Sequence, residues 1–398
     1  MKLFPGLVLA LLFSSYPLSA DTWLDLSEAM KSSKTQLNLR YRYEYVDQDG
    51  FDEEARASTL RGRLSWTSGA IGDWTAIVEA DYVAVIGTED YNSTENGKTE
   101  FPVVADPEGF DLNQALLKYS GDSADVSLGR QRIVHADQRF VGGVAWRQNE
   151  QTYDAARITY KAFEDVTIDY SYVWNVNRIF GPDDGAQPAD WRSDSHFLTA
   201  KIGVSEGHTI EGFVYLLDFE NDNGPPNSNA TYGVSYRGSF APLSIAATYA
   251  TQSDYGDSPL DYDADFYALE LGLSLKPVKL TAGIQVLGSD DGTAGFRTPL
   301  ATLHKWQGFA DKFLGTPPAG VEDIYVGLTG KLGPVNLAAT YHDFSSDEGS
   351  LDYGDELNLV ATWKAHEHLT VQAKFADYSA DDFATDTTKV WLSLIVSL

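Results

Sequence analysis

The feature that most constrains this chain is an alternation of apolar and polar side chains that recurs from residue 36 to residue 398. In the first run, from Gln36 to Tyr45, the odd positions are Leu or Tyr, and the even positions are Gln, Asn, Arg or Glu. A period of two predicts a β-strand whose two faces meet different surroundings. About 18 such runs follow one another. The predicted strand centres are Arg40, Leu60, Val78, Leu116, Leu128, Ile158, Tyr170, Ala200, Phe213, Val234, Ile245, Leu269, Ala282, Val326, Leu337, Leu359, Val371 and Leu394.

The connections between these runs alternate in length. Thr67–Asp73 and Ser205–Gly207 are short, whereas Val83–Asp111, Asn177–Ser195 and Ser289–Val321 are long and polar. Barrels of the bacterial outer membrane have short periplasmic turns and long outer loops in this way. Backbone groups in hydrocarbon must all be paired, so such a sheet has to close on itself. The sequence therefore predicts an all-β fold, a closed antiparallel transmembrane β-barrel of about 18 strands with long acidic extracellular loops.

The first residues have the pattern of a cleaved secretory signal. Lys2 precedes an apolar stretch from Leu3 to Phe13, and small residues follow at Ser19 and Ala20. We predict a signal peptide over residues 1–20, a periplasmic lead-in over 21–35 and the barrel over 36–398. The predicted location is the cell outer membrane. The predicted partners are the lipid bilayer, lipopolysaccharide and the outer-membrane assembly machinery.

Composition excludes several other classes of protein. The chain has 58 acidic against 29 basic residues, a formal net charge of −29, which argues against nucleic-acid binding. It has no cysteine, which excludes disulfides, thiol catalysis and Cys-type metal sites. Aromatic residues make up 13% of the chain, which argues against disorder.

Four stretches in the first half resemble the alginate export family of outer-membrane proteins. They are Asn38–Glu44, Tyr91–Gly97, Pro102–Gly109 and the run from Gly129 through Trp146 to Thr152. The resemblance implies an 18-stranded, porin-like channel with an arginine-rich constriction that passes an acidic polysaccharide. The second half is similar to the family only in its alternating texture.

Basic residues are concentrated in the first half, where 12 of the 14 arginines precede residue 200. On the predicted polar faces they form a stripe of cations along the lumen wall. Guanidinium groups in such a stripe bind carboxylates through paired hydrogen bonds. The alternative is that Glu44, Glu79 and Asp81, the predicted acidic residues of the lumen, neutralise the stripe and stabilise a polar interior. The predicted stripe consists of Arg40, Arg42, Arg61, Arg63, Lys118, Arg130, Arg132 and Arg157.

Two connections are candidates for segments that fold inward and narrow the pore. Tyr91–Asp111 combines Pro and Gly with polar residues over a length that is usually functional or disordered. Arg139–Arg147 is glycine-rich and flanked by arginine. For each, the alternative is an outer loop ordered by its own packing.

We predict no metal site and no cofactor apart from a weak surface Ca²⁺ at Asp261–Asp265. That stretch has calcium-loop spacing but carries Phe266 where the motif needs glycine. Catalytic residues are not predicted, because no Ser, His and acidic group stands out as a triad.

The sequence thus predicts a channel for anionic oligosaccharides, polysaccharides or related acidic solutes, with alginate export as one case. A general or cation-favouring porin for small nutrients is the alternative, since acidic loops would dominate its field. An outer-membrane hydrolase is the minor alternative.

Overall fold

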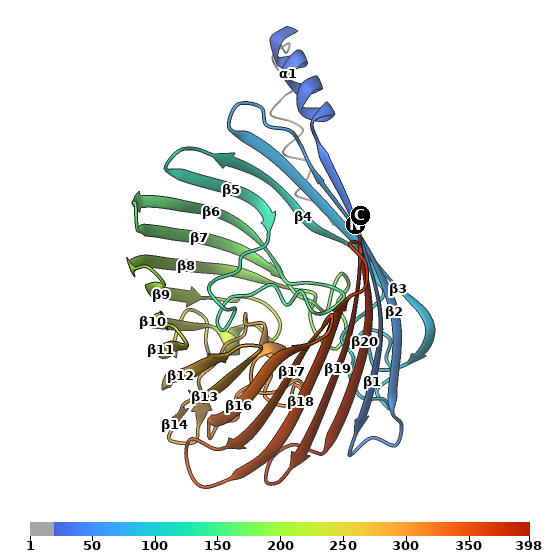
Figure 1. Cartoon of the computed structure of the whole chain (residues 1–398), viewed down its shortest axis with the longest axis vertical. Helices are drawn as coiled ribbons and strands as arrows, with labels where there is room; N and C mark the ends of the chain where they lie inside the picture. The colour runs from blue at the N-terminus through green and yellow to red at the C-terminus, as the bar shows by residue number, and fades with distance from the viewer. Residues whose placement is uncertain (1–19) are drawn as a thin grey trace.

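A closed β-barrel is the main feature of the computed structural model, which describes residues 20–398 (Figure 1). The predicted signal peptide, residues 1–20, lies outside the described residues except for Ala20. Eighteen antiparallel strands form one sheet. Strand β1 (Lys34–Gln48) pairs with strand β20 (Thr387–Ser397) and so closes the barrel.

The other elements are few and short. A helix, α1 (Ala20–Lys31), precedes β1, and a two-stranded hairpin, β14 (Ser289–Asp290) and β15 (Ala294–Gly295), lies outside the main sheet, as do the 3₁₀ turns η2 (Pro225–Asn227) and η3 (Leu303–Lys305). The remaining barrel strands are β2 (Ala55–Thr67), β3 (Trp74–Asp90), β4 (Gly109–Ser120), β5 (Ala124–Gln131), β6 (Thr152–Phe163), β7 (Val166–Asn177), β8 (Asp190–Ser205), β9 (His208–Leu217), β10 (Asn229–Phe240), β11 (Leu243–Asp254), β12 (Asp263–Leu275), β13 (Val278–Leu287), β16 (Val321–Leu332), β17 (Val335–Ser345), β18 (Asp352–Lys364) and β19 (Leu369–Ala380).

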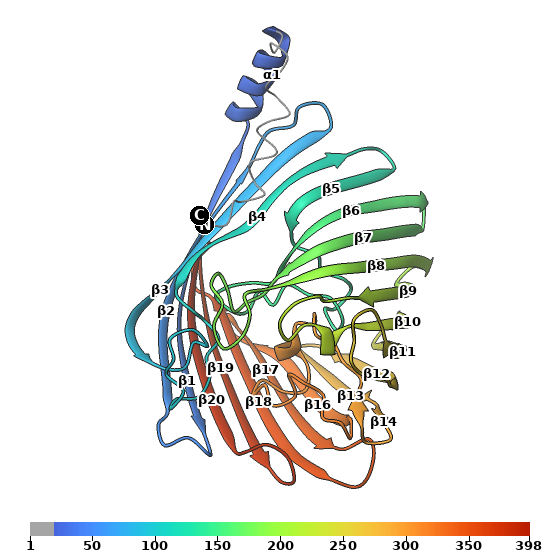
Figure 2. The same cartoon turned by 180° about the vertical axis from the view of Figure 1, so that it is seen from behind.

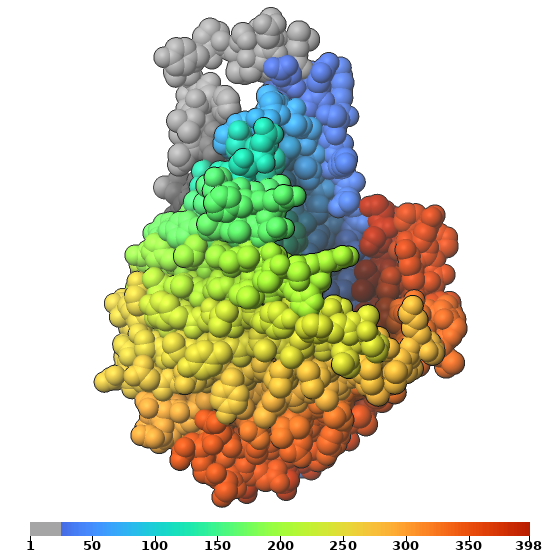
Figure 3. Space-filling model, turned by 60° about the vertical axis from the view of Figure 1, so that its left-hand side comes forward, coloured from blue at the N-terminus to red at the C-terminus, as the bar shows by residue number. Residues whose placement is uncertain are grey.

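The predicted fold is confirmed, and each predicted strand centre lies within a barrel strand. The strands follow one another in chain order around the outside of the molecule (Figure 3). The alternation explains why the barrel has two different faces. On β12, Tyr267, Leu269 and Leu271 are exposed on the outside, whereas Phe266 is buried inside. The outer face is apolar and fits a lipid environment.

Two strand boundaries differ from the sequence prediction. Strand β3 continues past Val83 to Asp90, and β8 begins at Asp190 instead of Ser195. Both extensions are paired with a neighbouring strand: Asp90 pairs with Arg56, and Asp190 pairs with Asn177. Backbone hydrogen bonds between strands continue beyond the apolar band, where a side-chain pattern no longer marks the strand.

Short turns gather at one end of the barrel and long loops at the other, as predicted. Helix α1 extends from the short-turn end (Figures 1 and 2). Its last turns are anchored there, because the backbone N–H of Gly69 in the β2–β3 turn donates to the Ala29 carbonyl at 2.8 Å. Within residues 20–398, no helix is long and apolar enough to cross a membrane.

Three long connections fold into the barrel, and we call them the inner segments (Figure 2). They are residues 91–108 after β3, 132–151 after β5 and 296–320 after β15. The second and third run side by side through a parallel bridge between Val141 and Leu300. Trp146 of the second stacks on His304 of the third, with ring centroids 3.4 Å apart. Burial and the neighbouring Lys374 ammonium lower the pKa of His304 well below its usual value.

The core lies inside the barrel, between these segments and the wall. Phe140 of the second inner segment packs on Phe213 of β9 and Phe266 of β12, with ring centroids 4.8 and 5.4 Å apart. Phe296 and Leu300 of the third segment are fully buried in the same cluster. Aromatic packing of this kind gives the inner segments a fixed position in the long-loop half of the lumen.

Candidate functional site

The candidate site is the inner wall of the barrel together with the inner segments that cover part of it. Both segments singled out by the sequence, Tyr91–Asp111 and Arg139–Arg147, have residues inside the lumen. Arg147 contacts Glu44 of β1 at 3.0 Å, and Asp106 contacts Arg42 of β1 at 3.3 Å.

Arg40 and Arg42 of β1 hold the second inner segment by its backbone. Arg40 donates to the Gln148 side chain and to the Ala145 carbonyl, both at 2.9 Å, and also to the Arg147 carbonyl. Arg42 donates to the Trp146 carbonyl. Both arginine side chains are buried. Their hydrogen-bonding capacity is therefore directed to the protein and not to the pore.

A buried ion network joins the inner segments to each other. Burial alone would raise the pKa of Asp106, but the Arg42 and Arg147 guanidinium groups outweigh burial and lower it. Burial would also lower the pKa of Arg147, yet Glu44 and Asp106 raise it. Asp311 of the third segment accepts from Lys389 of β20 at 3.0 Å. Each of these side chains has an oppositely charged partner.

Arg61 and Arg63 of β2 are also engaged by neighbours. Arg61 donates to the Asn38 side chain at 2.5 Å. Arg63 makes two hydrogen bonds to Asp81 of β3, at 2.7 and 2.5 Å, and an ion pair with Glu150 at 2.5 Å. Paired hydrogen bonds between guanidinium and carboxylate are among the strongest polar contacts in proteins.

The three predicted acidic residues lie in this same region and are buried. Glu44 pairs with Arg147, Asp81 with Arg63, and Glu79 with both Arg63 and Arg132. Glu150 pairs with Arg63 and with Arg132, so it connects the β2 arginine to the next part of the predicted stripe.

The cations of β4 to β6 have different surroundings. Arg130 pairs with Asp154 and Arg157 with Asp169, yet each guanidinium side chain keeps 25% of its surface exposed. A lumen cavity of about 260 Å³ is lined by Lys118, Arg132 and Arg157, and its only acidic lining residue is Asp125. Lys118 forms no ion pair with any residue of the described range 20–398. This cavity is a site where solute carboxylates can meet basic side chains.

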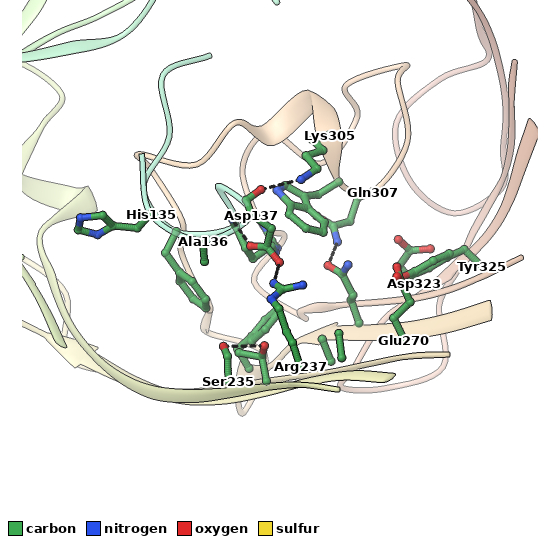
Figure 4. A pocket seen from close by; sticks show the side chains of 18 of the residues that line it. His135, Ala136, Asp137, Ser235, Arg237, Glu270, Lys305, Gln307, Asp323 and Tyr325 are labelled. Carbon is green, nitrogen blue, oxygen red and sulfur yellow. Dashed lines mark hydrogen bonds and ion pairs between the residues drawn. The ribbon is translucent and has the colours of Figure 1, made fainter. Parts of the chain in front are cut away.

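A larger cavity, of about 340 Å³, lies between the inner segments and strands β9 to β18. Figure 4 shows Lys305, Asp137 and Arg237 on one side and Glu270, Asp323 and Tyr325 on the other. None of these residues is among the site residues predicted from the sequence. The glycine-rich Arg139–Arg147 signal pointed to the neighbouring inner segment, but nothing in the pattern singled out Glu270 or Lys305.

Tyr325 fixes the position of Glu270 by reaching across the adjacent strand. Its hydroxyl donates to Glu270 at 2.8 Å and passes over Gly283 of β13. A Cβ atom at residue 283 would lie 2.3 Å from the tyrosine ring, so only glycine leaves room for this crossing. The contact therefore depends on one glycine in the strand between the two side chains.

No group of three or more His, Cys, Asp or Glu side chains within residues 20–398 is arranged to hold a metal ion. Asp263 and Asp265 begin strand β12. The weak surface Ca²⁺ at Asp261–Asp265 stays a prediction.

Comparison with known protein families gives one match, to alginate export, over residues 32–337. This chain belongs to the alginate export family. The match confirms the resemblance and extends it well into the second half of the barrel. Curated proteins offer no match to the chain.

Solved structures with the same fold are outer-membrane porins. Acinetobacter baumannii OccAB4 has a TM-score of 0.72 and 14% identity, with 92% of this chain and 98% of that chain covered. Pseudomonas aeruginosa OccK3 has a TM-score of 0.70 and 14% identity, covering 96% and 99%. Pseudomonas aeruginosa OpdK, solved with vanillate, has a TM-score of 0.69 and 12% identity, covering 93% and 99%. At this identity the likeness shows the fold alone.

Family and fold together define the coarse function. The chain is an outer-membrane, porin-like β-barrel channel whose apolar outer face contacts the lipid bilayer. The matching family and the structural neighbours are channel proteins and not enzymes.

Proposed function

We propose that this channel passes anionic saccharides or related acidic solutes, and that Lys118 and Arg157 contact them. The observation that carries the proposal is the cavity on strands β4 to β6, which is lined by Lys118, Arg132 and Arg157 and in which Lys118 has no ionic partner among residues 20–398. Basic side chains along a pore favour anions electrostatically. Vanillate, bound by the distant fold relative OpdK, is itself the anion of an acid. Export of alginate is one case within this class.

The test is the ion selectivity of the purified channel in planar bilayers under a KCl gradient. We expect the wild type to prefer chloride, K118Q to reduce that preference and K118Q/R157Q to reduce it further. Arg132 stays unchanged, because Glu79 and Glu150 both depend on it. R192Q is the matched control, since Arg192 is largely exposed at the long-loop end of β8. A potassium-selective wild type that K118Q/R157Q leaves unaltered would contradict the proposal.

The acidic hairpins support a second candidate function, a general or cation-favouring porin. Asp47, Asp49 and Asp52 lie at the β1–β2 hairpin, and the whole chain has a net charge of −29. Exposed loop charges are screened by salt. Potassium preference that disappears between 0.1 and 1 M KCl, roughly the range over which the Debye length falls from about 10 to 3 Å, would favour this candidate.

A further inference from the structure

Four charged side chains that line the 340 Å³ cavity form no ion pair with any residue of the range 20–398, namely Arg139, Glu211, Glu270 and Lys305. Arg139 lies over the rings of Phe266 and Trp306. Among residues 20–398, Lys305 forms no ion pair, and its ammonium donates only to the Asp137 carbonyl, at 2.8 Å. Within the described part of the chain, Glu270 pairs with no cation and accepts only from the Tyr325 hydroxyl. Two other charges of the cavity are compensated, Arg237 by Asp137 and Asp323 by a hydrogen bond from His342.

The register of the barrel keeps these charges apart. Arg237 of β10 lies opposite Ala246 of β11, and Ala246 lies opposite Glu270 of β12. Two interstrand spacings of about 4.8 Å separate the backbones of Arg237 and Glu270 by about 10 Å. The residue between them is Ala246, whose small side chain leaves space between Arg237 and Glu270. Lys305 reaches the cationic side from the third inner segment.

The rest of the cavity wall combines rings and amides. Phe140 and Trp306 lie on its inner-segment side, and Phe213 lies on the barrel side. Gln307 donates to Gln285 at 3.0 Å between the two charged sides (Figure 4). Apolar walls with a few placed polar groups are typical of small-molecule sites, and the volume is at the small end of their range of about 300–1,000 Å³.

We propose that this cavity binds a small zwitterion with an apolar side chain, of the α-amino-acid class. The solute carboxylate would lie against Lys305 and Arg237, its ammonium group against Glu270, and its side chain among the rings. An anion alone would leave Glu270 unpaired, and a cation alone would leave Lys305 unpaired. The inference rests on the proposed channel only in that solutes must reach the lumen.

The experiment records single channels in planar bilayers with L-phenylalanine as the probe. 3-Phenylpropionate lacks its ammonium group and 2-phenylethylamine lacks its carboxylate, so they are matched controls. We expect L-phenylalanine to interrupt the current at concentrations roughly tenfold lower than either analogue, because it makes one more charge-assisted contact than each.

Two substitutions assign the contacts. E270Q should weaken the L-phenylalanine effect to that of 3-phenylpropionate, and K305Q should weaken it to that of 2-phenylethylamine. E322Q, on the same barrel wall but at an outward position of β16, should change nothing. If E270Q does not insert, Y325F tests the same contact by removing the hydroxyl that orients Glu270.

Equal potency of L-phenylalanine and 3-phenylpropionate on the wild type would overturn the inference, as would an undiminished L-phenylalanine effect in E270Q. The proposed anion preference is measured on the same channels in KCl alone. L-phenylalanine block that persists when K118Q/R157Q has lost its chloride preference would show that the two sites act separately. Chloride preference without L-phenylalanine block would disprove only the zwitterion site.

Discussion

The two halves of the basic stripe have the same side-chain chemistry but opposite surroundings. Arg40 and Arg42 on β1 are buried beneath the second inner segment, and their donors bind its carbonyls. Arg157 on β6 keeps a quarter of its side chain exposed, and Lys118 on β4 has no ionic partner within residues 20–398. Position on the lumen face is therefore not enough to make a cation a solute contact. What decides is whether an inner segment lies over it.

This difference separates two roles that a basic residue can have in a pore. A buried guanidinium that loses its partner is costly, about 3–5 kcal/mol, so a buried arginine fixes the segment that it binds. A partly exposed cation has water as an alternative partner, and a passing carboxylate replaces that water at little cost. We expect the first role to affect the width of the pore and the second to affect its selectivity.

The largest expected effect comes from removing the buried half. R40A/R42A leaves the carbonyls of Ala145, Trp146 and Arg147 without their donors and leaves Asp106 without its nearest cation. We expect the second inner segment to detach, the single-channel conductance to rise several-fold and a protease to cut within residues 132–151. Barrel pairing should persist, since it does not depend on these side chains.

R56A is the control for this change. Arg56 lies at the rim, pairs with Glu54 and is half exposed, so its loss should alter neither conductance nor proteolysis. Unchanged conductance and unchanged cleavage in R40A/R42A would show that aromatic packing alone holds the segment, and the contrast between the two halves would then lose its meaning.

A smaller effect is expected at the residue that joins the halves. Glu150 is buried and pairs with Arg63 on one side and Arg132 on the other. In E150Q, Arg63 keeps Asp81 and Arg132 keeps Glu79, so the loss should be about 1–3 kcal/mol of unfolding free energy. The lumen gains net positive charge. Thermal unfolding should occur at lower temperature and the reversal potential should move toward chloride, whereas E322Q should change neither.

Salt should affect the two halves of the basic stripe differently. Attraction by Lys118 and Arg157 acts through water and should weaken between 0.1 and 1 M KCl, as the Debye length falls from about 10 to 3 Å. The contacts of Arg40 and Arg42 are buried and should not respond to salt. We therefore expect chloride preference to decline with salt while the protease pattern of residues 132–151 stays constant. If the protease cuts within residues 132–151 only at 1 M KCl, the contacts of Arg40 and Arg42 are as accessible to salt as those of Lys118 and Arg157, and the two halves do not differ.

The barrel can be predicted well from the sequence because alternation and turn length are local features of the chain. Alternation assigns the two faces of a strand such as β12, and the turn lengths assign the two ends of the barrel. The site is less predictable because its contacts are not local. Arg40 meets Gln148 across 108 positions of sequence. Glu270 has no cationic partner among residues 20–398. The strand register, the small Ala246 side chain and the crossing of Tyr325 over Gly283 set its position, and no sequence pattern near Glu270 indicates them.

The smallest expected effect concerns a partly buried carboxylate that belongs to an inner segment. Glu95 lies where the first inner segment meets the β7–β8 loop, next to the hydrogen bond from the Ala186 backbone N–H to the Thr94 carbonyl at 2.7 Å. Burial, followed by the charge of Asp183, raises the pKa of Glu95 to about 7. The packed loops thus hold this proton more tightly than the unpacked chain does. Contact between the loops should strengthen as pH falls from 8 through 7 and should stop changing below the ordinary pKa of a glutamate, about 4.3.

Hydrogen exchange at Ala186, corrected for its intrinsic rate, should show more protection at pH 6 than at pH 8, by a modest factor because the side chain is partly solvated. E95Q should give equal protection at both pH values. A pH dependence that survives in E95Q would mean that Asp183 or another group titrates, and Glu95 would then be as well compensated as the acids buried beside Arg63.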